Sequence, residues 1–130
     1  MNDIKSPLTG KTLFTKEELQ CRASGQYRLA KGFVDALQAL RVELDESMYV
    51  SSCCRSTEHN KTVGGAPGSF HICDGSDGCC AIDISIKSSA YAAKLVKLAL
   101  NKGWSVGVSS KFIHLDRRTD FDREQKLFGY

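Results

Sequence analysis

The sequence predicts a single domain that mixes helices with short strands. Two segments carry apolar residues at helical spacing, and four short β-prone runs lie between and after them. A chain of 130 residues is long enough for one hydrophobic core but not for two. We therefore expect residues 1–130 to form one domain.

The N-terminal third is expected to contain two helices. Residues 1–27 are polar and turn-rich, but residues 15–18 form a capping box that begins a short helix through Leu19. In residues 29–45 the apolar positions recur every three to four residues, which predicts an amphipathic helix with one buried stripe. The positions of this stripe are Leu29, Phe33, Leu37, Leu40 and Leu44.

A strand and a long loop are predicted next. Residues 48–53 form a short β-prone run that would place Arg55 at the end of a strand. Residues 56–70 are expected to form a loop, because glycine and proline pairs at 64–65 and 67–68 interrupt regular structure. Loops on a rigid framework often carry catalytic or binding residues.

A second strand and a second long helix follow. Residues 80–86 alternate between three isoleucines and a more polar set, so Asp83 would face away from the core. Ser88 or Ser89 is expected to cap a helix at about residues 90–101.

Two closing strands are expected at residues 104–108 and 111–115. Because side chains alternate along a strand, His114 and Asp116 would share one face of the second of these. The charged tail, residues 117–130, is expected to be a short helix or coil.

Charge and composition narrow the possible partners. The chain has 18 Lys and Arg against 15 Asp and Glu, and the basic residues are scattered, so nothing favours nucleic-acid binding. Residues 1–8 lack the apolar run of a signal peptide, and no stretch is long enough to span a membrane. We expect a monomer that is synthesised in the cytoplasm.

Six cysteines include two adjacent pairs, which is not typical of a regular disulfide framework. Without a signal peptide, free thiols or metal binding are favoured over structural disulfides. Residues 73–80 could form a local thiol cluster, and both a disulfide and a second metal site stay open there. The cysteines are Cys21, Cys53, Cys54, Cys73, Cys79 and Cys80.

Two histidines and a carboxylate, His71, Asp83 and His114, are candidate zinc ligands. A catalytic zinc ion takes three protein ligands of these types and keeps its fourth position for water. The alternative is that each residue is an ordinary surface or hydrogen-bonded group, since no helical register links His71 to Asp83.

Four motifs occur in order along the chain. They are Arg55-x-x-x-His59-Asn60-x-x-Val63-Gly64-Gly65-Ala66-Pro67-x-Ser69-x-His71, Ala81-x-Asp83-Ile84, Gly103-Trp104-x-x-Gly107-Val108 and Phe112-Ile113-His114-Leu115-Asp116-x-Arg118. This set resembles the M15 family of zinc peptidases, which includes D-alanyl-D-alanine carboxypeptidases and phage endolysins. The resemblance covers about residues 33–118. It implies an α+β fold of the hedgehog type, with a small, mainly antiparallel sheet and packed helices.

The resemblance also implies roles for individual residues. His71, Asp83 and His114 match the ligands of a catalytic Zn²⁺ ion. Arg55 matches the arginine that binds the substrate carbonyl or carboxylate and stabilises the oxyanion. Ser69 matches a serine near the substrate, and a hydroxyl that stabilises the loop is the alternative.

The sequence departs from the family pattern in two places. The spacer between His71 and Asp83 is longer than in the family pattern. The extra residues correspond to an insert at about 73–80, which is expected to bulge outward as a loop. Many relatives place a catalytic acid or histidine two or three residues before the last ligand, where this chain has Phe112 and Lys111. Asp116 is the nearest substitute as general base, but it could instead hydrogen-bond a ligand histidine or pair with Arg118.

These observations predict a zinc-dependent peptidase that hydrolyses a peptide bond of bacterial cell-wall peptidoglycan, a substrate that the resemblance implies. Synthesis without a signal peptide would suit a phage lysis or particle protein that meets the wall after release. One alternative is a non-catalytic, zinc-stabilised cell-wall-binding or phage-particle module of the same fold. Another is a thiol-based redox or metal-storage protein that uses Cys53, Cys54, Cys73, Cys79 and Cys80.

Overall fold

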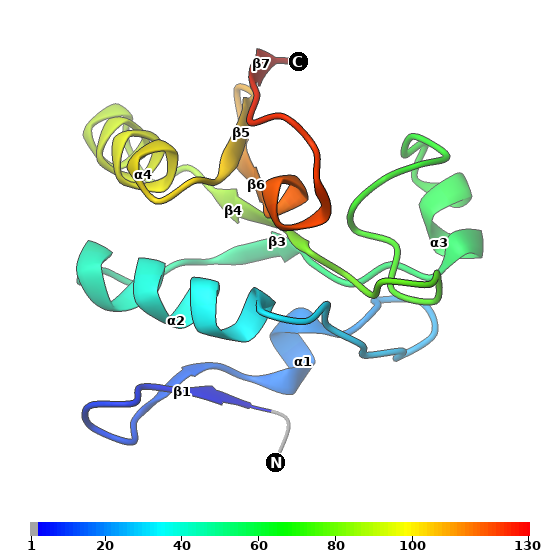
Figure 1. Ribbon diagram of the computed structural model, residues 1–130, viewed down its shortest axis with the longest axis horizontal. Helices are drawn as coiled ribbons and strands as arrows, with labels where there is room; N and C mark the ends of the chain where they lie inside the picture. Colours follow the sequence, from blue (N-terminus) through cyan, green and yellow to red (C-terminus); the bar gives the residue numbers. More distant parts are fainter. Residues whose placement is uncertain (1–2) are drawn as a thin grey trace.

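The computed structural model describes residues 3–130. The expectation that no signal peptide is present was based on residues 1–8, and residues 1–2 of that segment lie outside the described residues. A five-stranded sheet in the order β3-β4-β6-β5-β7 forms the centre of the molecule, and a separate hairpin pairs β1 with β2 (Figure 1). All pairs of neighbouring strands are antiparallel except β5 and β7, which are parallel. The strands are β1 (Ile4–Lys5), β2 (Thr12–Phe14), β3 (Val50–Ser52), β4 (Ala81–Ser85), β5 (Ser105–Val108), β6 (Phe112–Asp116) and β7 (Leu127–Gly129).

Helices surround this sheet, and the expected α+β fold is confirmed. The two long helices, α2 and α4, pack against each other, and α4 also contacts β5 and β6. In Figure 1, α3 lies at the opposite side of the molecule from α4. The helices are α1 (Lys16–Leu19), α2 (Phe33–Leu44), α3 (Thr57–Thr62), α4 (Ser89–Asn101) and a 3-10 helix, η1 (Arg118–Phe121).

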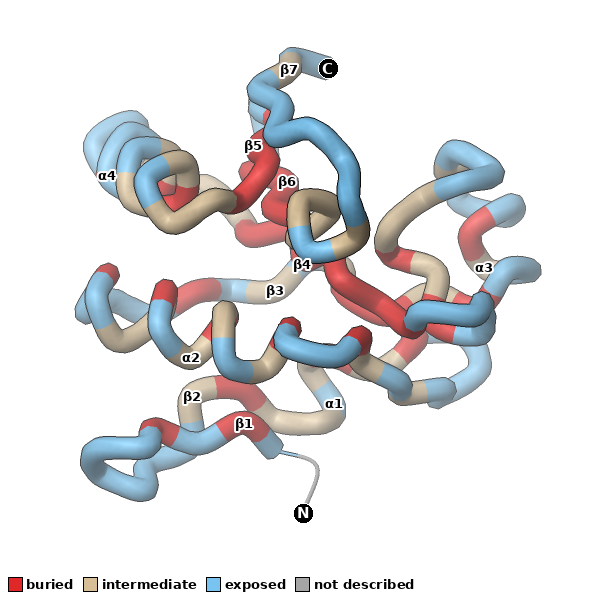
Figure 2. Tube along the Cα trace, in the orientation of Figure 1, coloured by how far each residue is buried: buried red, intermediate tan, exposed pale blue. Residues whose placement is uncertain are grey.

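Strand alternation divides the central sheet into a core face and a polar face. In β4, Ile82 and Ile84 are fully buried and belong to the hydrophobic core, whereas Asp83 points to the other side. Residues that lie opposite each other on paired strands share a face, and Asp83 pairs with His114 of β6. Figure 2 shows the buried positions concentrated along the central strands. The polar face of β4 and β6 therefore carries two of the candidate metal ligands.

Local capping explains where several helices begin. Thr15 and Glu18 form the expected capping box at the start of α1, with both reciprocal hydrogen bonds present. Of the two serines proposed to cap the second long helix, Ser88 is the cap, and its hydroxyl accepts from the backbone N–H of Tyr91. None of the helices within residues 3–130 is long and apolar enough to cross a lipid bilayer.

The first long helix starts later than its apolar spacing predicts. It begins at Phe33, after Gly32, whose φ of 84° lies in the left-handed region that favours glycine. Leu29 instead forms an isolated bridge with Cys79 and packs on the core from outside the helix. Leu29, a partly buried residue just before the helix, has the same spacing as one more helical turn.

One helix and three strands were missed by the sequence prediction. Residues 57–62, expected to be loop, form α3, capped by the hydroxyl of Ser56. The turn-rich start contains the hairpin of β1 and β2. The tail contains the expected short helix, η1, but also β7, which extends the sheet beside β5.

Candidate metal centre

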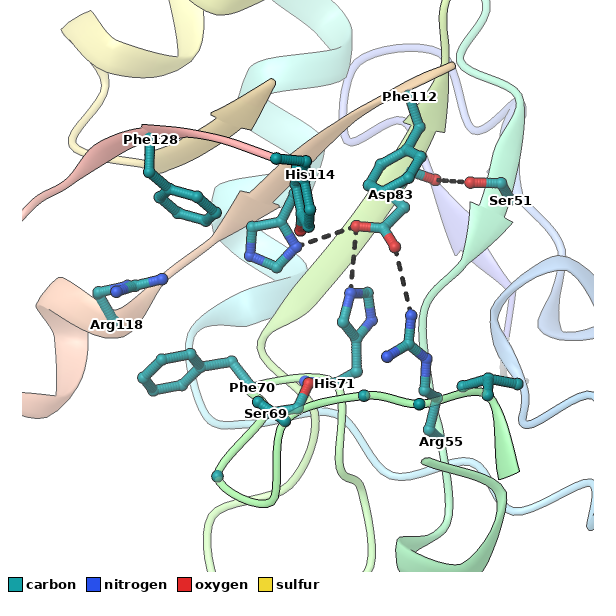
Figure 3. Close-up of a pocket in the computed structure, with 16 residues that line it drawn as sticks. Ser51, Arg55, Ser69, Phe70, His71, Asp83, Phe112, His114, Arg118 and Phe128 are labelled. Atoms are coloured by element: carbon teal, nitrogen blue, oxygen red, sulfur yellow. Dashed lines mark hydrogen bonds and ion pairs between the residues drawn. The ribbon is translucent and has the colours of Figure 1, made fainter. Parts of the chain in front are cut away.

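The structure brings His71, Asp83 and His114 together. One ligand atom from each lies within 4.8 Å of the other two. The Oδ1 atom of Asp83 is 3.1 Å from Nε2 of His71 and 2.9 Å from Nδ1 of His114. Figure 3 shows the carboxylate of Asp83 between the two imidazole rings, at the floor of a cleft. All three residues are buried.

The loop that carries His71 is tied to the segment after β3. The backbone N–H of Arg55 donates to the carbonyl of His71 at 2.9 Å, and the N–H of Cys73 donates to the carbonyl of Arg55 at 2.8 Å. The hydroxyl of Ser69 accepts from the N–H of His71 at 3.2 Å. This contact stabilises the loop, which was the alternative role expected for Ser69. Ser69 also lines the cleft, and its predicted contact with substrate stays a prediction.

Each histidine is oriented by a second partner behind the cleft. Nδ1 of His71 lies 2.7 Å from the carbonyl oxygen of Cys53, and Nε2 of His114 lies 2.8 Å from Oδ2 of Asp116. A carbonyl or a carboxylate can only accept, so in the neutral rings these nitrogens carry the protons. When a metal ion binds, Nε2 of His71 and Nδ1 of His114, the two atoms that face Asp83, would offer their lone pairs to it. In the metal-free site, a protonated ring donates from the same atom to the carboxylate of Asp83.

The charges of the site reinforce one another. Burial opposes ionisation of Asp83, but hydrogen bonds from His114 and His71 outweigh it and hold the pKa of Asp83 well below its usual range. Burial likewise opposes protonation of His114, but Asp116 and Asp83 raise its pKa overall. The ligand set therefore carries a carboxylate that stays ionised at neutral pH.

These residues fit a catalytic zinc site. Two imidazole nitrogens and one carboxylate oxygen are the donor types that such a site uses, and each histidine has an outer partner that fixes its ring. A cleft of about 680 Å³ opens in front of the three ligands, which leaves room for water and substrate. The arrangement is suited to a metal ion that keeps an open coordination position.

Arg55 lies at the edge of the same cleft. Its guanidinium donates to Oγ of Ser52 at 3.0 Å, to Oδ1 of Asn60 at 3.2 Å and to Oδ2 of Asp83 at 3.4 Å. Asn60 belongs to α3 and donates in turn to the carbonyl of Ala66 at 2.8 Å. The short helix missed in the sequence therefore positions the arginine that the sequence predicted as a substrate ligand.

Aromatic side chains form walls of the cleft, and those from β7 and the residue after it were not predicted. Phe128 packs near His114, with ring centroids 5.7 Å apart, and Tyr130 packs on Phe112 at 5.1 Å. The guanidinium carbon of Arg118 lies 4.8 Å from the ring centroid of Phe70. The alternation of aromatic residues at 128 and 130 was the available signal for a strand that faces the site.

Asp116 is fully buried, and both of its oxygens are engaged. Arg118 donates to its Oδ1 at 2.9 Å and to its Oδ2 at 2.7 Å, and the latter oxygen also faces His114. The contact with His114 and the ion pair with Arg118 are the two alternatives that the sequence offered to a role of Asp116 as general base. That role stays a prediction. Among the described residues that line the cleft, Asp83 has the sole side-chain carboxylate.

The insert after His71 is only partly an outward bulge. Residues 74–77 are exposed as expected, but Cys73, Cys79 and Cys80 on either side of them are buried. The hydroxyl and N–H of Thr57 both donate to Asp74, so the tip of the insert caps the start of α3.

Comparison with known proteins agrees with this geometry. A search of the curated proteins finds no match to the chain. A family model described as Peptidase M15 matches residues 12–116, a segment that contains Arg55, the three candidate ligands and Asp116. That match covers well over half of the sequence, and the chain therefore belongs to the Peptidase M15 family.

Proposed function

We propose that this protein is a zinc-dependent peptidase that hydrolyses a peptide bond of bacterial cell-wall peptidoglycan. The observation that carries the proposal is the convergence of His71, Asp83 and His114 at the floor of an open cleft. Membership of the Peptidase M15 family supports metallopeptidase chemistry. The choice of peptidoglycan follows from the resemblance to wall-cleaving carboxypeptidases and endolysins.

The three ligands would hold the metal through Nε2 of His71, a carboxylate oxygen of Asp83 and Nδ1 of His114. When bound, a zinc ion supplies a Lewis acid that polarises the scissile carbonyl and lowers the pKa of a coordinated water. Asp83 contributes a negative charge that is kept ionised by its neighbours, and the carbonyl of Cys53 and the carboxylate of Asp116 hold the two rings in orientation.

Arg55 would bind the carbonyl or carboxylate of the substrate beside the metal. Its charge is permanent, and its contacts with Ser52 and Asn60 fix the plane of the guanidinium before substrate arrives. Donors that are already in place stabilise the negative charge that develops on the carbonyl oxygen in the transition state. Arg118 faces the same cleft but is held by Asp116, so we assign it to the wall and not to the oxyanion.

We assign Asp116 to positioning, because its oxygens are occupied by His114 and Arg118. Acting as the base would require its carboxylate to leave both partners and reach the cleft. By fixing the tautomer and orientation of His114, Asp116 would strengthen metal binding without touching the substrate.

The lack of a free base in the cleft favours one second candidate, a non-catalytic wall-binding module. Apart from the three ligands, no side-chain carboxylate or imidazole lines the cleft among the described residues. Such a module would keep the metal and the peptide groove but release no product.

Mass spectrometry of purified peptidoglycan fragments tests both candidates. The peptidase predicts a new fragment that disappears with a chelator and returns with added Zn²⁺, and Arg55→Ala should lower its yield strongly while metal content is retained. Wall binding with stoichiometric zinc and no new fragment from several wall types would overturn the peptidase and favour the module.

A further inference from the structure

Four buried cysteines gather on the side of His71 that faces away from the cleft. Cys53 and Cys54 follow the end of β3, whereas Cys73 and Cys79 flank the exposed tip of the insert. Each of the four is at most 2% exposed. Two separate segments of the chain therefore bring their thiols into one interior cluster.

The distances within the cluster suit a metal ion. The sulfurs of Cys53, Cys54 and Cys79 lie within 4.8 Å of one another, and Sγ of Cys53 is 3.8 Å from Sγ of Cys79. Cys73 is buried as well and lies near the Cys54 thiol, at the edge of the same group. Tetrahedral zinc sites with a structural role are built from three or four cysteine thiolates.

We propose that Cys53, Cys54 and Cys79, with Cys73 as fourth ligand, bind a second metal ion of the zinc type that has a structural role. Soft thiolates select zinc and similar ions over Mg²⁺ or Ca²⁺. Each ligating thiol releases its proton to solvent when the ion binds, so a divalent ion with four thiolates carries two net negative charges. Arg28 lies beside the cluster, where it donates to the carbonyl of Cys73 at 3.4 Å, and can offset part of this charge.

Two other arrangements of the thiols are weaker explanations of this geometry. A disulfide between Cys53 and Cys79 would use two sulfurs and leave Cys54 and Cys73 unexplained. If the cysteines were ordinary core residues that bind no ion, the thiols of the adjacent Cys53 and Cys54 would not need to point into the same cluster. Successive side chains of a strand point to opposite faces, and Cys53 and Cys54 converge because β3 ends at Ser52.

The thiol cluster is joined to the candidate metal centre through one backbone carbonyl. The carbonyl of Cys53 accepts from Nδ1 of His71 at 2.7 Å and from the thiol of Cys79 at 3.3 Å. Cys73 is two residues after His71, and Cys79 is four residues before Asp83. An ion at the thiols would therefore clamp the insert to the segment that orients His71, whether or not the protein cleaves peptidoglycan.

Titration of the reduced, metal-free full chain with Co²⁺ tests the proposal. Thiolate ligands give cobalt an intense charge-transfer absorption in the near ultraviolet, which a site of two histidines and one aspartate cannot produce. We expect two ions per chain and this absorption in the wild type. His114→Ala should keep one ion and the absorption, whereas replacing Cys53, Cys54 and Cys79 together by serine should lose the absorption and one ion. Cys80→Ser is the matched control, a buried thiol outside the cluster that should change neither.

The wild-type spectrum alone can overturn the inference, so misfolding of a cysteine variant cannot hide the answer. Uptake of a single Co²⁺ without thiolate absorption by the fully reduced chain would show that the cysteines are core residues. The melting temperature provides a second readout that does not depend on the cobalt absorption. Zn²⁺ should raise the melting temperature of His114→Ala, and no rise there would also contradict a structural ion.

Discussion

Two regions of the molecule hold the candidate metal ligands in different ways. Asp83 and His114 are opposite each other on paired strands at the centre of the sheet, where backbone hydrogen bonds on both sides fix their separation. His71 lies in a loop that is held to the segment after β3 by individual contacts, such as the 2.9 Å hydrogen bond from the N–H of Arg55. The sheet therefore fixes the distance between Asp83 and His114, and the loop determines whether His71 lies close enough to complete the ligand set.

This difference separates the tasks of the two regions. The loop side carries Arg55 and the network of α3, which we assign to transition-state stabilisation. The strand side carries His114, Asp116 and the aromatic wall of β7, which we assign to metal affinity and substrate binding. Substitutions on the two sides should therefore change different kinetic constants.

The largest effect is expected at the residue shared by both sides. Asp83→Ala removes the carboxylate that contacts both histidines and Arg55, so zinc binding and peptidase activity should both be abolished. Zinc content and fragment release measure this directly. Ser85→Ala, on the same face of β4, is the control and should retain both. Stoichiometric zinc with normal activity in Asp83→Ala would refute the assigned ligand set.

A single methyl group can test the loop side. A Cβ atom at Gly65 would lie 2.8 Å from Cγ of Asn60 and 3.0 Å from Nη1 of Arg55, so Gly65→Ala should displace the arginine. We expect kcat to fall about 100-fold, as for loss of one oxyanion donor, with zinc content unchanged. Gly68→Ala in the same loop has open space around it and should have little effect. Equal activity of the two variants would remove Arg55 from the mechanism.

The outer partner of His114 gives a smaller effect that depends on pH. Burial opposes ionisation of Asp116, but hydrogen bonds from His114 and Arg118 lower its pKa from 3.8 to about 2. A lowered pKa stabilises the fold above the unfolded value of 3.8, and this contribution is lost as pH falls through about 2. Asp116→Asn should therefore reduce the unfolding free energy of the metal-free chain by roughly 2 kcal/mol at pH 6, and the difference should shrink towards pH 2.

Urea unfolding of both chains at several pH values measures this difference, and zinc titration at neutral pH complements it. Loss of the charged partner should weaken zinc affinity by about 10-fold or more. A difference in stability that is independent of pH would mean that the hydrogen-bond geometry, and not the ionised carboxylate, stabilises the fold. A collapse of kcat with full zinc occupancy would instead support the predicted role of Asp116 as base.

The strand side of the site was the easier one to predict from sequence. Alternation in residues 80–86 placed Asp83 opposite the isoleucines, and the same rule placed His114 and Asp116 on one face. The register that pairs Asp83 with His114 could not be derived, because their strands are separated by a helix and another strand. Pairing over such distances leaves no local pattern.

The loop side was harder because its structure depends on contacts with distant segments. The glycines and proline at 64–68 concealed the short helix α3, whose start is capped both by Ser56 and by Asp74 of the insert. In the same way, β7 is a strand only because β5 lies beside it in parallel. Aromatic alternation at residues 128 and 130 was a local signal, but it could not identify the strand's neighbour.

The smallest effect is expected at the aromatic wall of the strand side. A Cβ atom at Gly107 would lie 2.5 Å from Cε2 of Phe128 and 3.0 Å from Cε2 of Tyr130. These are outer ring atoms of side chains at the edge of the sheet, so the rings can shift, and Gly107→Ala should cost only about 1 kcal/mol of stability. Because Phe128 packs near His114, the shift should narrow the cleft and raise KM several-fold while kcat and zinc content hold.

Gly129→Ala provides the matched control for this last substitution. It adds the same methyl group to the partner strand β7, but its nearest contact is an ordinary 4.0 Å to the carbonyl of Val108. Steady-state kinetics on a soluble wall peptide distinguishes the two variants. If Gly107→Ala lowered kcat as Gly65→Ala is expected to do, the two sides of the site would not have separate tasks. A rise in KM alone would place substrate binding on the strand side and oxyanion stabilisation on the loop side.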